Sequence, residues 1–99
     1  MRSCEKVVFY DSQLGRFVVE FFRGRAFLHL KLGEKKKEAV RVMLALWPEY
    51  RKILRAIGYT KLYAYNREEI IEWPAFMRHL GFIPVLNRKG WLFMESNNA

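Results

Sequence analysis

Alternating apolar and polar residues in the first third of the chain predict a three-stranded meander. The strands are expected at Val7–Tyr10, Arg16–Phe22 and Ala26–Lys31. In the third strand, Phe27, His29 and Lys31 fall on one face. Leu28 and Leu30 fall on the other face, because successive side chains of a strand point to opposite sides.

A helical repeat of apolar residues follows Gly33, at spacings of three and four positions. The stripe contains Val40, Met43, Leu44, Trp47, Tyr50, Leu54 and Ile57. It passes through Pro48 without a change of phase, so we expect one kinked helix that starts at Glu34 and stops at Gly58. Because Leu44 lies centrally on the stripe, Leu44→Asp is expected to bury a charge and unfold the domain.

The second half of the chain predicts a strand, a helix and a closing hairpin. The strand is expected at Thr60–Tyr65, after which Asn66 leaves it and caps the next helix. That helix carries Ile70, Ile71, Trp73, Phe76, Met77 and Leu80, and Phe82–Leu86 with Gly90–Glu95 form the hairpin. A polar tail, Ser96–Ala99, is expected to fray. The order βββ-α-β-α-ββ predicts an α/β fold with helices packed on a mixed sheet, in a single domain of residues 1–99.

Composition narrows the classes of protein that the chain can belong to. With 99 residues and 52% hydrophobic content, the chain can bury one core. It contains neither an apolar signal-peptide segment nor the run of ~20 apolar residues that a membrane helix needs. A single cysteine, Cys4, excludes an internal disulfide, and His29 and His79 lack carboxylates at metal-ligand spacing. We therefore expect no metal and an intracellular, cytoplasmic location.

The net charge of +8 predicts an anionic partner, either an acidic protein surface or nucleic acid. Basic residues occur beside aromatic ones in the meander, an arrangement that can stack bases and hold phosphates. Lys35, Lys36 and Lys37, with Arg41, make the helix start strongly basic, although such a run is also typical of a solvated surface. The edge strand at Val7–Tyr10 leaves both a monomer and a homodimer open.

The chain from Asn66 onward carries a family resemblance. A strand ends in Tyr65-Asn66, the next helix ends in Leu80-Gly81-Phe82, and a hairpin follows from Ile83 to Met94. In these features the chain resembles the GNAT acetyltransferases, whose core has the same element order once its first strand and first two helices are removed. It also resembles the small GNAT-like proteins of short-tailed bacteriophages. The resemblance implies a truncated GNAT-like fold and, for a viral protein, a location in the host cytoplasm.

The resemblance also implies where acetyl-CoA would bind if the chain is an active enzyme. The implied cofactor-binding residues are Leu30, Leu32, Gly33, Lys35, Lys36, Lys37 and Asn66. The implied catalytic residues are Tyr63 or Tyr65 as the acid and His29 as the base.

Two positions depart from the pattern of the GNAT enzymes. Those enzymes bind pyrophosphate with a loop of the type Arg/Gln-x-x-Gly-x-Gly/Ala, whereas Leu32–Ala39 offers one glycine and a lysine run. Many of them also carry a tyrosine acid where this chain has Met77. These departures favour a degenerate, non-catalytic domain without a cofactor, which binds a macromolecule of the host or of a virion. A minimal acetyl-CoA-dependent N-acetyltransferase and a small basic nucleic-acid-binding module remain alternatives.

Overall fold

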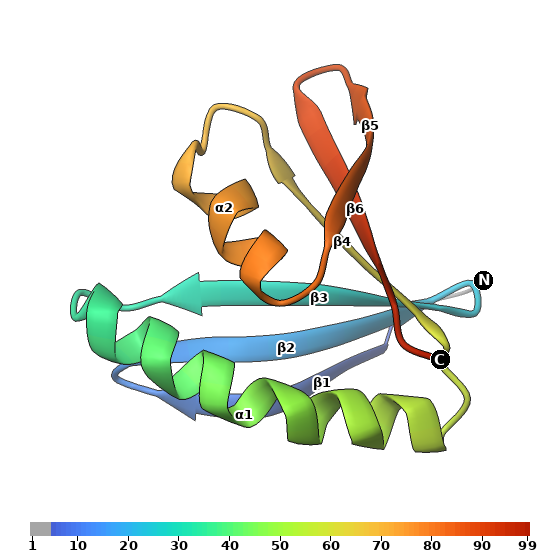
Figure 1. Ribbon diagram of the computed structural model, residues 1–99, viewed down its shortest axis with the longest axis horizontal. Coiled ribbons are helices and arrows are strands. Elements are labelled where there is room, and N and C mark those ends of the chain that lie inside the picture. The colour runs from blue at the N-terminus through green and yellow to red at the C-terminus, as the bar shows by residue number, and fades with distance from the viewer. Residues whose placement is uncertain (1–4) are drawn as a thin grey trace.

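The computed structural model describes residues 5–99, so Cys4 lies outside the described part of the chain. The strands are β1 (Glu5–Ser12), β2 (Gly15–Phe22), β3 (Arg25–Leu32), β4 (Lys61–Arg67), β5 (Ile83–Arg88) and β6 (Trp91–Asn97). The helices are α1 (Lys36–Ala56) and α2 (Glu72–His79). The strands form one sheet in the order β1-β2-β3-β4-β6-β5, with β3 parallel to β4 and the other neighbours antiparallel (Figure 1). The predicted α/β fold and element order are confirmed.

Two tight turns set the register of the hairpins. Arg23 and Gly24 have φ angles of 51° and 75°, and Lys89 and Gly90 have φ angles of 53° and 82°. Two successive positive φ angles match the right-handed twist of the flanking strands, which is why glycine is favoured in such turns. The first turn joins β2 to β3, and the second joins β5 to β6.

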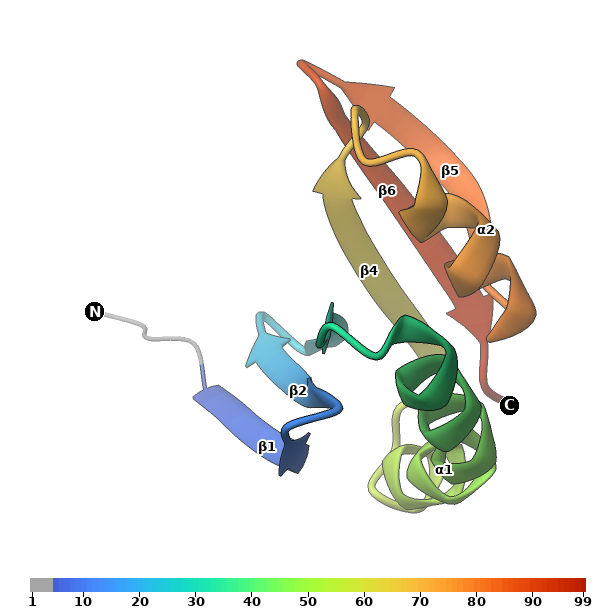
Figure 2. The ribbon, with the colours of Figure 1, turned by 90° about the vertical axis from the view of Figure 1, so that its left-hand side faces the viewer.

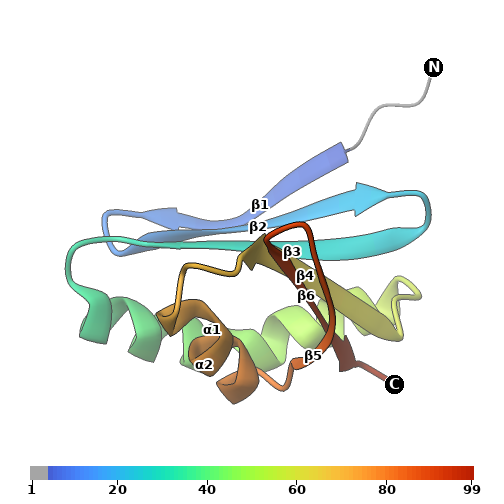
Figure 3. The ribbon, with the colours of Figure 1, turned by 90° about the horizontal axis from the view of Figure 1, so that it is seen from above.

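Both helices pack on the same side of the sheet, and alternate strand side chains point toward them (Figures 2 and 3). The fully buried core includes Phe17, Val19, Leu28, Met43, Leu54, Leu62, Met77, Leu80, Phe82 and Met94. Trp47 of α1 donates its indole N–H to the Leu80 carbonyl at 2.7 Å, and this bond ties α1 to the end of α2.

The other face of the sheet, which we call the open face, is covered by neither helix (Figure 3). Its side chains include Glu20, Arg25, Phe27, His29, Tyr63, Tyr65, Arg67, Trp91 and Phe93.

Helix α1 runs through Pro48 as one helix, but its buried stripe differs from the predicted one. The buried residues are Ala39, Met43, Trp47 and Leu54, whereas Leu44 is 37% exposed and Ile57 is 59% exposed. The prediction that Leu44 is central to the core is therefore wrong. Other apolar residues, such as Leu44 of α1 and Ile57 at its C-cap, flank the buried stripe. Their spacing along the sequence does not show which apolar residues lie at the centre of the buried face and which lie at its edge.

The C-terminal tail is not frayed, contrary to prediction. Strand β6 continues to Asn97, and Asn98 is fully buried. The Asn98 side chain donates to the carbonyls of Arg51 (3.2 Å) and Tyr59 (2.8 Å) and accepts a bond from Arg51 Nε (3.0 Å). Its backbone N–H donates to the Thr60 carbonyl at 2.8 Å. A polar side chain can be buried here because partners distant in sequence satisfy its hydrogen bonds.

The phase of α1 can be tested with two adjacent substitutions. Met43→Asp places a charge at a position with no exposure, so it should lower the free energy of unfolding by more than about 3 kcal/mol. Leu44→Asp should lower it by about 1 kcal/mol or less, because the new carboxylate reaches solvent. Urea denaturation followed by circular dichroism measures both values. Equal losses in the two variants would show that the helix is rotated from the described position.

The docking of the tail predicts a specific role for Asn98. Asn98→Ala removes the bonds to Arg51 and Tyr59 and should lower the free energy of unfolding by about 1–3 kcal/mol. Asn97→Ala is the matched control, since Asn97 is exposed, and its effect should stay within about 0.5 kcal/mol. Thermal denaturation of the two variants checks this, and indistinguishable melting curves would mean that the tail frays after all.

Candidate functional site

The sheet opens at the point where β3 and β4 diverge. The two strands pair only at Ala26↔Leu62, Phe27↔Tyr63 and Leu28↔Ala64, after which they run apart, as Figure 1 shows. A cleft of about 290 Å³ lies between the separated strand ends and the starts of the two helices. It is lined by Leu30, Lys31, Leu32, Lys36, Asn66, Ile70, Glu72, Trp73 and Phe76.

The cleft has mainly apolar walls and a few polar groups. Lys36 Nζ and Glu72 Oε2 lie 3.7 Å apart, so an ion pair links the starts of α1 and α2 across the cleft. Both side chains are more than 60% exposed, and such a pair contributes little to stability. An apolar pocket with a few polar groups is typical of a site for a small organic group.

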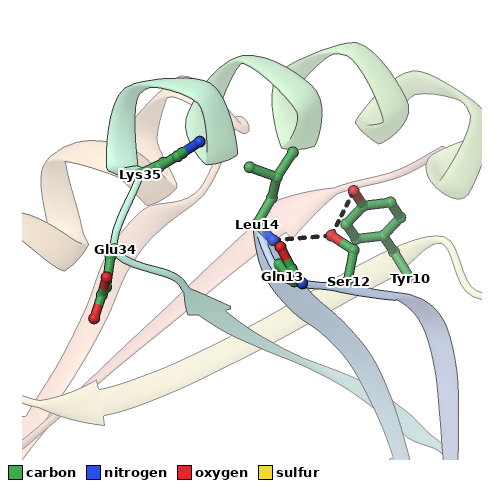
Figure 4. A pocket seen from close by; sticks show the side chains of 6 residues that line it. All are labelled: Tyr10, Ser12, Gln13, Leu14, Glu34 and Lys35. Atoms are coloured by element: carbon green, nitrogen blue, oxygen red, sulfur yellow. Dashed lines mark hydrogen bonds between the residues drawn. The ribbon is translucent and has the colours of Figure 1, made fainter.

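Four of the predicted cofactor-binding residues, Leu30, Leu32, Lys36 and Asn66, line this cleft. Lys35 instead lines a separate pocket of about 530 Å³, together with Tyr10, Ser12, Gln13, Leu14 and Glu34 (Figure 4). Lys37 lines a surface depression on α1 with Lys36, Val40, Arg41 and Leu44. Consecutive residues at a helix start point in different directions, so the three lysines do not converge on one ligand.

The pocket that contains Lys35 lies beside the β1–β2 turn. The Tyr10 hydroxyl meets Ser12 Oγ at 2.8 Å, and Ser12 Oγ also accepts the N–H of Leu14 (Figure 4). Burial raises the pKa of Tyr50, and the neighbouring Tyr10 adds to this shift. Tyr50 therefore stays neutral near pH 7.

Gly33 allows the loop before α1 to pack closely against the β1–β2 turn. Its N–H donates to the Leu14 carbonyl at 2.8 Å, and a Cβ at this position would lie 2.5 Å from the Gln13 carbonyl oxygen. The loop before α1 therefore needs glycine in order to pass the β1–β2 turn. Its N–H already binds the Leu14 carbonyl, and the cofactor-binding role of Gly33 stays a prediction.

Asn66 does not cap a helix, contrary to prediction. It lies within β4, which continues to Arg67 paired with Trp91, and its Oδ1 accepts the N–H of Arg67 at 2.8 Å. A turn follows, and α2 begins only at Glu72, with Ile71 at the N-cap and no side-chain cap. Pairing with β6 extends the strand beyond the point where local capping preference would end it.

Two of the predicted catalytic residues, His29 and Tyr65, lie together on the open face with Glu20. His29 Nε2 is 2.7 Å from Glu20 Oε1, and the Tyr65 hydroxyl donates to the same oxygen at 3.3 Å. The His29 and Tyr65 rings meet edge to face at 5.3 Å. Tyr63 stands apart from these contacts, between Phe27 and Arg25.

Glu20 was missed from the sequence. The available signal was that it is the one acidic residue in the apolar run of β2. Its contact with His29 follows from the pairing of β2 with β3, which places Glu20 opposite Phe27 and diagonal to His29. The predicted meander already implied that these two strands pair. The cluster lies where β3 and β4 separate, on the side of the sheet opposite the cleft. A histidine held by a carboxylate can accept a proton from a bound amine.

Among residues 5–99, no three His, Cys, Asp or Glu side chains come together to form a metal site. Neither α1 nor α2 has both the length and the apolar character that would let it cross a bilayer.

No protein-family model and no curated protein matches this chain. Its fold, however, is similar to that of solved N-acetyltransferases. The PaiA N-acetyltransferase of Thermoplasma acidophilum, solved in complex with coenzyme A, matches with a TM-score of 0.67 and 20% identity, over 85% of this chain and 53% of that one. An N-acetyltransferase of Staphylococcus aureus gives a TM-score of 0.69 at 12% identity, over 96% and 68% of the two chains.

An acetyltransferase of Bacillus cereus gives a TM-score of 0.62 at 16% identity, over 96% of this chain and 73% of that one. The chain therefore has a GNAT-like fold, and the fold prediction is confirmed. It spans about half the length of the Thermoplasma enzyme. The resemblance to bacteriophage proteins stays a prediction.

A coenzyme A thioester fits this site only in part. The apolar lining around Leu30, Leu32 and Phe76 suits an alkyl arm. The pyrophosphate needs backbone N–H groups presented at a helix start. Here the Gly33 N–H binds the Leu14 carbonyl. The loop before α1 therefore offers no glycine N–H to the phosphate part of the cofactor.

The packing role of Gly33 predicts the effect of adding one methyl group. Gly33→Ala forces a Cβ against the backbone of the β1–β2 turn and should lower the free energy of unfolding by about 1–3 kcal/mol. Lys35→Ala, two residues later and exposed, should change it by less than about 0.5 kcal/mol. Chemical denaturation gives both values, and an unchanged Gly33→Ala protein would contradict the close approach of the two loops.

Proposed function

We propose that this chain is a non-catalytic GNAT-like domain that acts by binding a macromolecular partner. The observation that carries the proposal is that residues at the start of α1 already contact other parts of the chain. Gly33 is hydrogen-bonded to Leu14, and Lys36 is paired with Glu72 across the cleft. The groups that would otherwise receive a pyrophosphate serve the fold instead.

The surroundings of Met77 support the same proposal. Met77 is 1% exposed and belongs to the core, and a thioether has no proton to donate to a leaving thiolate. The cleft lining contains no tyrosine. Tyr63 and Tyr65 lie on the open face, where Arg25 stacks on one and Glu20 binds the other. Neither tyrosine is placed to serve as an acid inside the cleft.

A minimal N-acetyltransferase is the second candidate, and the contact between Glu20 and His29 favours it. In this alternative His29 would accept a proton from an amine that approaches from the open face, and Glu20 would orient the imidazole. The cofactor arm would lie in the cleft beside Leu30 and Leu32.

Calorimetric titration with acetyl-CoA separates the two candidates. We expect no saturable heat up to about 1 mM cofactor, where any remaining affinity is weaker than about −4 kcal/mol. An amine-bearing peptide incubated with protein and acetyl-CoA should stay unmodified in mass spectrometry. Saturable one-to-one binding, or an acetylated peptide that disappears with His29→Ala, would reject the non-catalytic proposal.

Two variants show whether any heat observed in the titration comes from binding in the cleft. Leu32→Glu adds a carboxylate to the cleft wall, whereas Ile57→Glu adds one at a position that is 59% exposed and outside the cleft lining. Genuine cofactor binding would be weakened by Leu32→Glu alone. Equal weakening by both changes would indicate general charge repulsion and leave the proposal standing.

A further inference from the structure

A connected group of aromatic rings lies on the open face, and we call it the open-face cluster. Its members are Phe27, His29, Tyr63, Tyr65, Trp91 and Phe93. Tyr65 is central, with ring centroids 5.9 Å from Trp91 and 5.8 Å from Phe93. Each ring is only partly buried, whereas Phe17 and Phe82 on the helix side are 0% and 1% exposed. The rings belong to three strands, β3, β4 and β6. Both helices lie on the other side of the sheet, as the ribbon in Figure 3 shows.

Arginine side chains lie over the rings at two ends of the cluster. The Arg25 guanidinium is 5.3 Å from the Tyr63 ring centroid, and that of Arg67 is 5.1 Å from the Trp91 centroid. The distances are those of cation–π contacts, which hold planar cations beside the ring surface. Both arginines are exposed. Arg67 Nε donates to Glu69 Oε1 at 3.0 Å, and the guanidinium keeps further N–H groups that can reach an anion in solvent.

The acidic residues of this face are engaged by neighbouring groups. Glu20 is bound by His29 and Tyr65, and Glu95 pairs with Lys61 at 3.8 Å. The face therefore presents guanidinium groups beside partly exposed rings, on a chain with a net charge of +8. This combination complements a ligand that carries both negative charges and planar rings.

From this arrangement we infer that the open face binds single-stranded nucleic acid, an inference that rests on the proposed binding function. Unpaired bases would stack on the open-face cluster, and phosphates would contact Arg25 and Arg67. Base–aromatic stacking contributes about 1–3 kcal/mol per base and tolerates any sequence. A duplex would be a poorer ligand, because its bases stay stacked on each other. An acidic protein would match the positive charge of the face but would not stack bases on the aromatic rings.

Fluorescence anisotropy with labelled single strands tests the inference. Oligo-uridylate and oligo-thymidylate of equal length are compared with a duplex of that length and with polyglutamate as a competitor. The single strands should bind at least about tenfold more tightly than the duplex, which corresponds to about 1.4 kcal/mol. Whether RNA or DNA binds more tightly, the inference is supported, because the stacking surface serves both.

Matched variants test whether the oligonucleotide binds to the open face. Arg67→Ala and Trp91→Ala should each weaken binding at least about tenfold. Arg55→Ala removes the same charge from an exposed position on α1, on the opposite side of the sheet, and should weaken binding only about twofold at constant salt. Comparable weakening by Arg55→Ala and Arg67→Ala would overturn the inference, because it would show attraction by net charge alone.

Intrinsic fluorescence gives a second measurement that does not depend on a disruptive change. Trp47 and Trp73 are 5% and 9% exposed, so quenching on addition of an oligonucleotide should come from Trp91. In Trp91→Phe the quenching should vanish while binding is largely kept, since a ring remains. Quenching that persists in Trp91→Phe would overturn the inference.

Different results would reject the non-catalytic function and the nucleic-acid inference. Saturable binding of acetyl-CoA, weakened by Leu32→Glu, would reject the non-catalytic function whatever the oligonucleotides do. Absence of single-strand binding at about 0.1 mM would reject the nucleic-acid inference alone. Equal competition by polyglutamate would also reject it and would indicate an acidic protein partner.

Discussion

The short parallel pairing of β3 with β4 is the constraint on which the rest of the molecule depends. It joins the N-terminal meander to the C-terminal strands through three residue pairs, and Leu28, Leu62 and Ala64 from this junction enter the core. Because the strands separate after Leu28↔Ala64, the sheet opens at its centre. The cleft on the helix side follows from that separation.

The chain has a GNAT-like fold, and several positions considered for cofactor binding or catalysis make contacts within the chain. Gly33 is required where the loop crosses the β1–β2 turn, and Lys36 pairs with Glu72 across the cleft. Met77 fills the core at the position where many GNAT enzymes have a tyrosine acid. A fold supports many activities, and function depends on the side chains at a site. Here those side chains mostly hold the chain's own elements together.

The side chains of the open face, in contrast, leave surface in contact with solvent. Its rings contact each other and are capped by Arg25 and Arg67, yet they remain partly exposed. Contiguous exposed apolar surface on a folded domain often marks an interaction site. The helix side instead buries its aromatic residues in the core, and this difference between the two faces supports the proposal that a partner binds to the open face.

Local patterns along the chain were sufficient to predict the elements and their order. Strand alternation placed Phe27, His29 and Lys31 on one face, and glycine-containing turns located the hairpins. These features depend on neighbouring residues, so the sequence by itself determined them. The cleft residues Leu30, Leu32 and Asn66 were also named from the sequence, through the family resemblance, and their role with a cofactor remains a prediction.

The tertiary structure decided what depends on residues far apart in sequence. Periodicity did not show that Met43 is central to the helix face and Leu44 is at its edge, since the sheet beneath α1 selects the buried side. The burial of Asn98 depends on carbonyls from α1 and from the segment that follows it, and the extension of β4 past Asn66 depends on β6. The Tyr65 hydroxyl reaches Glu20 only because β4 lies beside β3. In each case the deciding partner is set by packing and strand pairing, which a local pattern does not contain.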